Sequence, residues 1–121
     1  MRLDHINLTV PEDGVDAEAA WLVDLLGYTT VEPGPDVAAL GRVHWFEAED
    51  GTQVHLSPDP DHRPSRRAHT AMFVGPGLEA LKEKVEASGQ ETFEIRLDGR
   101  RQLFATDPAG NLWEFVDRPD S

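Results

Sequence analysis

Three histidines and one glutamate occupy equivalent places in an internal repeat of this chain. His5 lies in the alternating run 4–10, and His69 has the same place in the similar run 68–74. His55 and Glu114 each follow a turn glycine by four residues. Imidazole and carboxylate groups are ligands of divalent transition metals, and a chance distribution of such residues would not place them at equivalent positions of the repeat. These four residues are therefore the candidate metal ligands, and Glu114 is also the candidate catalytic base.

Composition limits the classes of protein that this chain can belong to. At 121 residues it is expected to form one domain, 1–121, because each half alone is near the lower limit for an adequate core. It has no cysteine, so a metal site must use imidazole, carboxylate, backbone or water. The formal charge of −12 argues against nucleic acid and anionic membranes as partners. No signal segment or apolar span is recognisable, so a cytoplasmic location is expected.

The first half, 1–57, reads as a strand, a helix and three further strands. Residues 3–10 alternate as a strand does, and an apolar stripe at helical spacing from Val15 to Leu26 predicts a helix that ends at Gly27. Strands are expected at 28–32, 42–47 and 52–57, the last two joined as a hairpin, while residues 33–41 stay ambiguous.

The second half, 68–118, repeats this order after a proline-rich linker at 58–67. A strand at 69–74 precedes a helix that carries Leu78, Leu81 and Val85 on one stripe and ends near Ser88. Strands at 91–97, 101–106 and 112–117 complete it. The fold class is thus α+β, with two βαβββ modules.

Strand parity predicts which side chains share a face, because successive residues of a strand point to opposite sides. His5 and Asn7 fall on the face opposite the apolar residues, and Gln53 falls with His55. His69 shares its face with Phe73. Four residues are candidates for substrate binding if these faces line a common site: Asn7, Gln53, Phe73 and Phe104. For Phe46, Phe73 and Phe104, core packing is the competing interpretation, and for His44 and His62 a surface or hydrogen-bonded role is expected.

These motifs resemble those of the vicinal oxygen chelate superfamily, which includes glyoxalase I, fosfomycin-resistance transferases, extradiol dioxygenases and bleomycin-resistance proteins. The resemblance runs from about Leu3 to Asp117, and its most specific part is the segment 107–114, close to an Asp-Pro-x-Gly-Asn-x-x-Glu signature. It implies a cup-shaped mixed sheet with outer helices, and a divalent metal (zinc, nickel, cobalt, iron or manganese) on His5, His69 and Glu114. It also implies a homodimer.

The resemblance leaves several activities open. The equivalent of His55 is a glutamate in metal-dependent glyoxalases, so three imidazoles and one carboxylate would give the site a charge of about +1 with a divalent ion. The expected function is a metal-dependent lyase, isomerase, dioxygenase or transferase that chelates a small oxygenated substrate. The alternative is a metal-free, antibiotic-sequestering protein of the bleomycin-resistance type.

Overall fold

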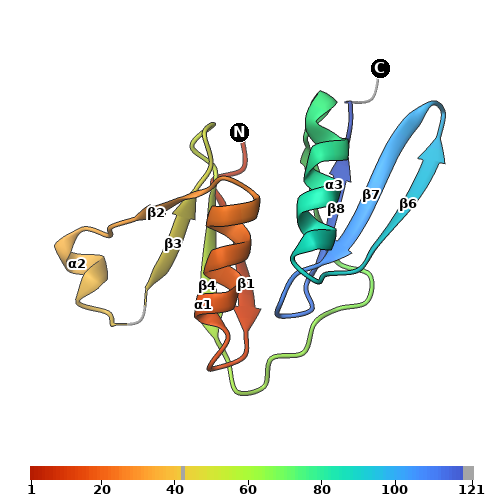
Figure 1. Ribbon diagram of the computed structural model, residues 1–121. Coiled ribbons are helices and arrows are strands. Elements are labelled where there is room, and N and C mark those ends of the chain that lie inside the picture. The colour runs from red at the N-terminus through yellow and green to blue at the C-terminus, as the bar shows by residue number, and fades with distance from the viewer. Residues whose placement is uncertain (42, 119–121) are drawn as a thin grey trace. The chain divides into compact units, whose positions relative to one another are not determined.

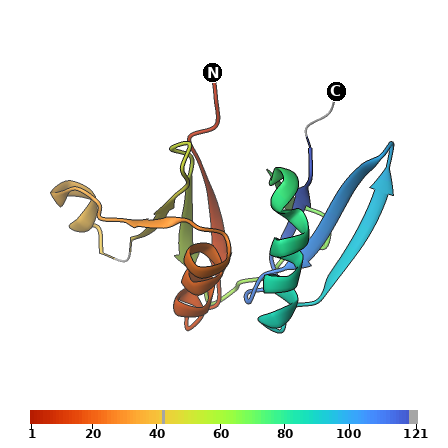
Figure 2. The ribbon, with the colours of Figure 1, turned by 45° about the horizontal axis from the view of Figure 1, so that its top comes forward.

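The computed structural model describes residues 1–41 and 43–118 of the chain, which divide into two compact units, 1–63 and 64–121. Each unit is a mixed four-stranded sheet with a helix on one face (Figure 1, Figure 2). The α+β class and the repeated βαβββ order predicted from the sequence are confirmed. In the described residues no helix is both long and apolar enough to cross a membrane.

The first unit contains strands β1 (His5–Val10), β2 (Thr29–Val31), β3 (His44–Glu47) and β4 (Gln53–Pro58) in the spatial order β1-β4-β3-β2. Strands β1 and β4 are parallel, and the other neighbours are antiparallel. The predicted start of β3 at Arg42 lies outside the described residues. Strand β4 extends through Pro58, the first residue assigned to the linker from the sequence.

The predicted helix of the first unit consists of two parts. The α-helix α1 (Val15–Ala20) continues as the π-helix η1 (Trp21–Leu25), where the Leu26 N–H donates to the Trp21 carbonyl. The wider π turn rotates the following side chains relative to a regular α-helix. Trp21 and Leu22, the first two residues of the π-helix, are both buried, although only Leu22 belonged to the predicted stripe. Gly27 follows with φ 79°, as the expected left-handed cap.

A short helix, α2 (Pro35–Ala38), lies in the stretch that the sequence left ambiguous. Pro35 stands in its first turn, where the missing N–H of proline is tolerated. The helix lies beyond β2 and away from the strand pair β1 and β4 (Figure 1).

The second unit contains β5 (His69–Phe73), the 3-10 turn η2 (Gly75–Gly77), α3 (Leu78–Ala87), β6 (Thr92–Leu97), β7 (Arg100–Thr106) and β8 (Leu112–Val116). The sheet order is β5-β8-β7-β6, with β5 and β8 parallel. It matches the order of the first sheet strand for strand, so the internal repeat seen in the sequence is a structural repeat.

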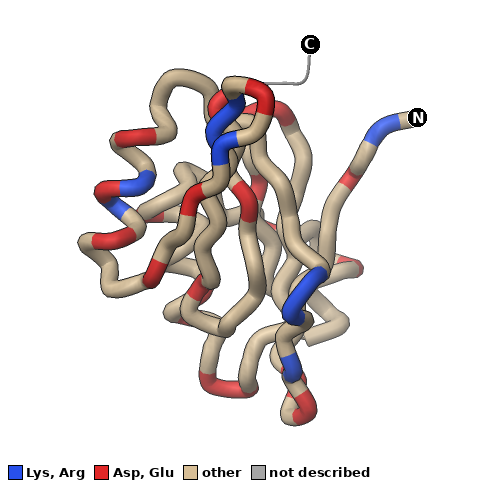
Figure 3. Tube along the Cα trace, turned by 90° about the vertical axis from the view of Figure 1, so that its right-hand side faces the viewer, with Lys and Arg blue, Asp and Glu red and all other residues tan. Residues whose placement is uncertain are grey.

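Each core lies between a sheet and its helix. Val54 and Leu56 of β4, and Trp113 and Phe115 of β8, are buried on the sheet faces predicted to be apolar. Burial of such side chains contributes hydrophobic stabilisation. The opposite sheet faces are left to carry the polar candidates. Acidic residues are spread along both units (Figure 3).

Candidate functional site

In the first unit, His5 and His55 lie on the paired parallel strands β1 and β4. The register places His5 opposite Gln53 and Asn7 opposite His55, so the two histidines are diagonal neighbours on one face. Their rings are stacked, with centroids 4.0 Å apart and planes inclined by 16°. Trp45, opposite His55 on β3, extends the stack at 4.4 Å. The result is a continuous three-ring stack across three strands.

Hydrogen bonds determine which ring nitrogens remain available. Nδ1 of His5 donates to the Asp4 carboxylate at 2.8 Å, so in the neutral ring Nε2 carries the lone pair. The Gln53 amide donates to Glu47 at 3.0 Å, which directs its carbonyl oxygen to Nε2 of His55 at 2.8 Å. Nε2 of His55 is therefore the donor, and its lone pair is on Nδ1. The two stacked imidazoles thus present different nitrogens for coordination.

The surroundings of the stacked rings also affect the pKa values of His55 and Asp4. Partial burial lowers the pKa of His55, and a positive charge on His5 would lower it further, with Asp4 acting in the opposite direction. The hydrogen bond from His5 lowers the pKa of Asp4. The arrangement favours a neutral His55, which is the form that can bind a metal.

In the second unit, His69 and Glu114 occupy the equivalent diagonal of β5 and β8, because His69 lies opposite Leu112 and Ala71 opposite Glu114. Nε2 of His69 is 3.1 Å from Oε1 of Glu114. Nδ1 of His69 donates to the Arg67 carbonyl at 2.8 Å, so in the neutral ring Nε2 carries the lone pair. Two lone-pair atoms then face each other, an arrangement that a proton or a cation between them stabilises.

Glu114 is the more enclosed member of this pair. Its side chain is 11% exposed, against 35% for that of His69. Its second oxygen accepts a hydrogen bond of 3.2 Å from the Gln102 amide on β7. Because Gln102 holds Oε2 of Glu114, Oε1 of Glu114 is directed at His69.

Aromatic rings border this pair. Phe104 lies opposite Glu114 on β7 and meets the His69 ring edge-on, with centroids 5.9 Å apart. Phe93 on β6 stacks on Phe104 at 4.8 Å. Phe104 therefore lies beside the candidate ligands, Phe46 is a core residue, and Phe73 is 62% exposed, contrary to the core interpretation.

The remaining predicted residues have other contacts. Asn7 accepts a hydrogen bond from Ser57 at 2.9 Å. His62 is 2.7 Å from the Thr9 hydroxyl, as expected for a hydrogen-bonded linker histidine, and His44 is half-buried on β3.

The structure therefore brings the four predicted ligands together as two pairs, one in each unit. Within residues 1–41 and 43–118, no group of three or more His, Asp or Glu side chains is arranged to hold a metal ion. Each pair has the donor chemistry of a half-site for a borderline divalent metal, with imidazole nitrogen in both and carboxylate oxygen in one.

Sequence reasoning included Phe104 among the substrate-binding candidates but missed the other residues that support the two pairs. Trp45 and Phe104 are equivalent in the repeat, since each lies opposite the second member of its pair. Aligning the hairpins by their turn glycines would have found Trp45. Asp4 and Gln102 carry no comparable signal, because polar residues are common on strands and beside them.

Comparisons with known proteins agree with this description. The profile of the Glyoxalase/Bleomycin resistance protein/Dioxygenase superfamily matches residues 2–115. No curated protein sequence matches the chain.

Solved structures share the fold. A protein from Bacillus anthracis described as glyoxalase family has a TM-score of 0.82 at 20% identity, covering 98% of this chain and 96% of its own. A fosfomycin resistance protein, FosX, from Listeria monocytogenes has a TM-score of 0.81 at 20% identity, covering 98% and 91%. A glyoxalase/dioxygenase from Nostoc punctiforme has a TM-score of 0.78 at 23% identity, covering 98% and 92%. The repeat, the two sheets and the match over residues 2–115 together show that this chain belongs to the Glyoxalase/Bleomycin resistance protein/Dioxygenase superfamily.

Proposed function

We propose that this protein is a divalent-metal-dependent enzyme that acts on a small substrate with two adjacent oxygen atoms. His5, His69 and Glu114 would hold the metal, with His55 as a fourth ligand. The observation that carries the proposal is the shared state of His5 and His69. In both, Nδ1 donates to an oxygen and Nε2 carries the lone pair. Metal-binding histidines are typically oriented by such a bond from the other ring nitrogen.

The donor set supports a borderline metal such as zinc, nickel, cobalt, iron or manganese. When bound, a divalent ion polarises a substrate oxygen and stabilises negative charge on it. The chain's own residues supply the remaining functions. The Asp4 carboxylate and the Arg67 carbonyl orient the two imidazoles.

Glu114 is the proposed proton acceptor. One of its oxygens is held by Gln102, while the other is directed toward His69, so the carboxylate has a fixed orientation. Phe104 beside it would shield that oxygen from water on one side.

Metal content of protein purified without chelator or nickel affinity resin tests this proposal. Elemental analysis is expected to find one divalent ion per chain, and His5→Ala and Glu114→Ala are each expected to reduce it to about a tenth or less at equal free metal. The matched control is His44→Ala, which removes an imidazole of the first unit from outside the pairs and should retain full metal content. Circular dichroism of each variant reports folding.

The stoichiometry also separates the competing arrangements. Two ions per chain, with each alanine variant losing only one, would show two separate half-sites and contradict a common site. Metal-free wild-type protein that binds an antibiotic would instead support the sequestering function. Turnover of a substrate with adjacent oxygens by the metal-loaded protein, lost in Glu114→Ala, would complete the case for an enzyme.

A further inference from the structure

Strand β6, at the edge of the second sheet, carries a row of exposed apolar side chains on the sheet face that also carries Gln102 and Phe104. Phe93, Ile95 and Leu97 are 56%, 40% and 58% exposed. The sheet order β5-β8-β7-β6 leaves the outer edge of β6 without a paired strand among the described residues. Long apolar edge strands are uncommon in monomers, because they are templates for pairing with another chain.

The backbone of β6 directs specific groups toward that edge. The Arg101 N–H donates to the Asp117 carboxylate, and the Arg101 carbonyl accepts from the Asp117 N–H, so both groups of Arg101 point away from β6. Arg96 lies opposite Arg101, and this is therefore a non-hydrogen-bonded pair of the antiparallel ladder. Pair types alternate along the ladder, so Thr92, Glu94 and Arg96 present their N–H and C=O groups to the open edge.

We infer that this edge binds a second copy of the chain through antiparallel β6–β6 pairing, with Ile95 on the two-fold axis. In this register Glu94 lies opposite Arg96 of the second copy, and Phe93 lies opposite its Leu97. Residues with outward backbone groups then face each other, as a hydrogen-bonded ladder requires. One surface serves both partners, which is the requirement for an isologous dimer.

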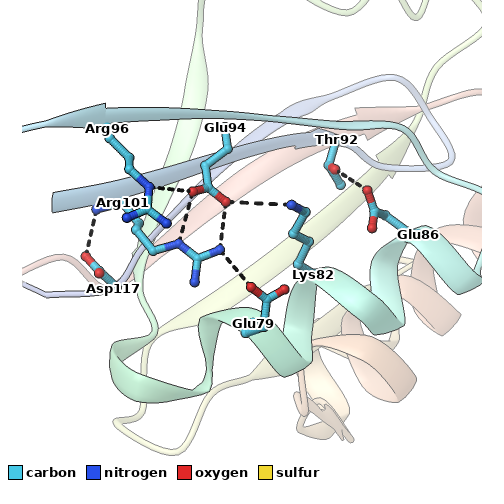
Figure 4. A network of polar contacts seen from close by, with 8 residues as sticks. All are labelled: Glu79, Lys82, Glu86, Thr92, Glu94, Arg96, Arg101 and Asp117. Atoms are coloured by element: carbon cyan, nitrogen blue, oxygen red, sulfur yellow. Dashed lines mark hydrogen bonds and ion pairs between the residues drawn. The ribbon is translucent and has the colours of Figure 1, made fainter.

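Charge selects this register over its neighbours. Two neighbouring registers also bring outward backbone groups together. One places Glu94 opposite Glu94 of the second copy, and the other places Arg96 opposite Arg96 of the second copy. Like charges directly opposite each other are unfavourable. The Arg96 side chain is 72% exposed and lies 3.4 Å from Glu94 of its own strand, so it can reorient with little loss (Figure 4). Glu94 is held in place by Arg101 at 2.7 Å.

A second copy fits the edge better than an apolar small molecule. A small molecule could cover the exposed rings and aliphatic groups, but it would leave the row of backbone donors and acceptors unpaired. A second β6 pairs these groups and also places the apolar side chains of the two strands beside one another. The net charge of −12 opposes association, but salt near 0.15 M screens charges separated by more than about 8 Å.

Disulfide trapping tests the register directly, because the chain contains no cysteine. In the proposed dimer, Ile95→Cys places two Cβ atoms about 5 Å apart, close enough to form a disulfide with a small shift. Phe93→Cys is the matched control on the same strand and face. Its two copies would be about 13 Å apart, beyond disulfide reach.

Under mild oxidation near 0.15 M salt, Ile95→Cys is expected to form covalent dimer at least about tenfold faster than Phe93→Cys. Equal rates would overturn the pairing, whatever other surface the chain uses to associate. Linkage in Phe93→Cys alone would show a different register and also overturn it.

Sedimentation equilibrium gives a second, independent test of the interface. Arg96→Glu is expected to raise the dimer dissociation constant by about tenfold or more, since it places like charges opposite each other twice, while Arg96→Lys should retain association. Leu40→Asp changes an 80% exposed leucine of the first unit and should have no effect. A wild-type chain that stays monomeric at high concentration, or an Arg96→Glu variant that associates like wild type, would refute the interface.

Discussion

The same diagonal of two parallel strands carries a ring stack in the first unit and an imidazole–carboxylate pair in the second. His5 and His55 are in ring contact at 4.0 Å, whereas His69 and Glu114 approach atom to atom at 3.1 Å. In the first unit, hydrogen bonds hold both rings, including Nε2 of His55. The backbone repeat therefore determines the positions of these residues. The difference in interaction comes from the residue on the last strand of each unit, which is histidine in the first unit and glutamate in the second.

The largest expected difference between the two pairs is in metal affinity. Glu114→Gln removes the only anionic group from the proposed ligand set, so metal affinity should fall by more than about 100-fold. This exceeds the loss that is typical when a residue hydrogen-bonded to a metal ligand is changed. His55→Gln should cost about tenfold, because it removes a neutral ligand and leaves the anionic one in place. Competition with a chromophoric chelator measures both. Equal losses would show that the two pairs contribute alike.

The turns before the last strands provide the next contrast. Ala48 and Asp107 are equivalent, since each N–H donates to the carbonyl four residues later. Asp107 is 2% exposed and accepts hydrogen bonds from two backbone N–H groups, those of Ala109 and Asn111, and from the buried Trp113 indole at 2.9 Å. Asp107→Ala should lower the free energy of unfolding by about 2 kcal/mol.

The control for this prediction lies in the first unit. There the exposed Asp50 caps the turn through the Thr52 N–H and hydroxyl. Asp50→Ala should therefore cost less than half as much free energy of unfolding as Asp107→Ala. Urea unfolding of both variants measures the difference, and a cost for Asp50→Ala as large as that for Asp107→Ala would contradict the assigned role of the buried aspartate.

Sequence patterns predicted the fold because strand alternation and the turn glycines are local signals. Gly51 and Gly110 both have positive φ, 91° and 86°, and their spacing identified His55 and Glu114 as equivalent. The supporting contacts were not predictable in this way. The stack of Trp45 on His55 depends on strand register, and the buried role of Asp107 depends on how the turn packs against Trp113. The extra residue in the π turn also breaks the helical period on which the prediction relied.

A further contrast concerns ionic contacts between the helix and the sheet of each unit. In the second unit Glu94 of β6 binds Arg101 and lies near Lys82 of α3, whereas residues 15–26 of the first unit contain no basic side chain (Figure 4). Glu94→Gln should lower the free energy of unfolding by about 1 kcal/mol at neutral pH, after allowance for solvent screening.

The pH dependence of that loss provides the check. The hydrogen bond from Arg101, with its charge, lowers the pKa of Glu94 below the usual 4.5. The stabilisation is present above this value and is lost as pH falls through the lower folded pKa. The difference between Glu94→Gln and wild type should therefore shrink in acid. Glu83→Gln, an exposed change on α3, should show neither effect.

The smallest expected effect is the response of the ring stack to acid in metal-free protein. Burial and His5 lower the pKa of His55 below 6.5, so in the unfolded chain this ring takes up a proton at higher pH than in the folded chain. Its contribution to stability is complete above pH 6.5 and is lost as pH falls through 6.5 toward the lower folded pKa. Urea unfolding at about pH 7.5 and about pH 5.5 should show a smaller acid-induced loss for His55→Gln than for wild type. The other titrating groups are shared by both proteins, so the difference between the two losses isolates this ring. If both proteins lose the same stability, the stack does not discriminate between the protonated and neutral forms of His55, and the contrast between the two diagonals rests on their ligand atoms alone.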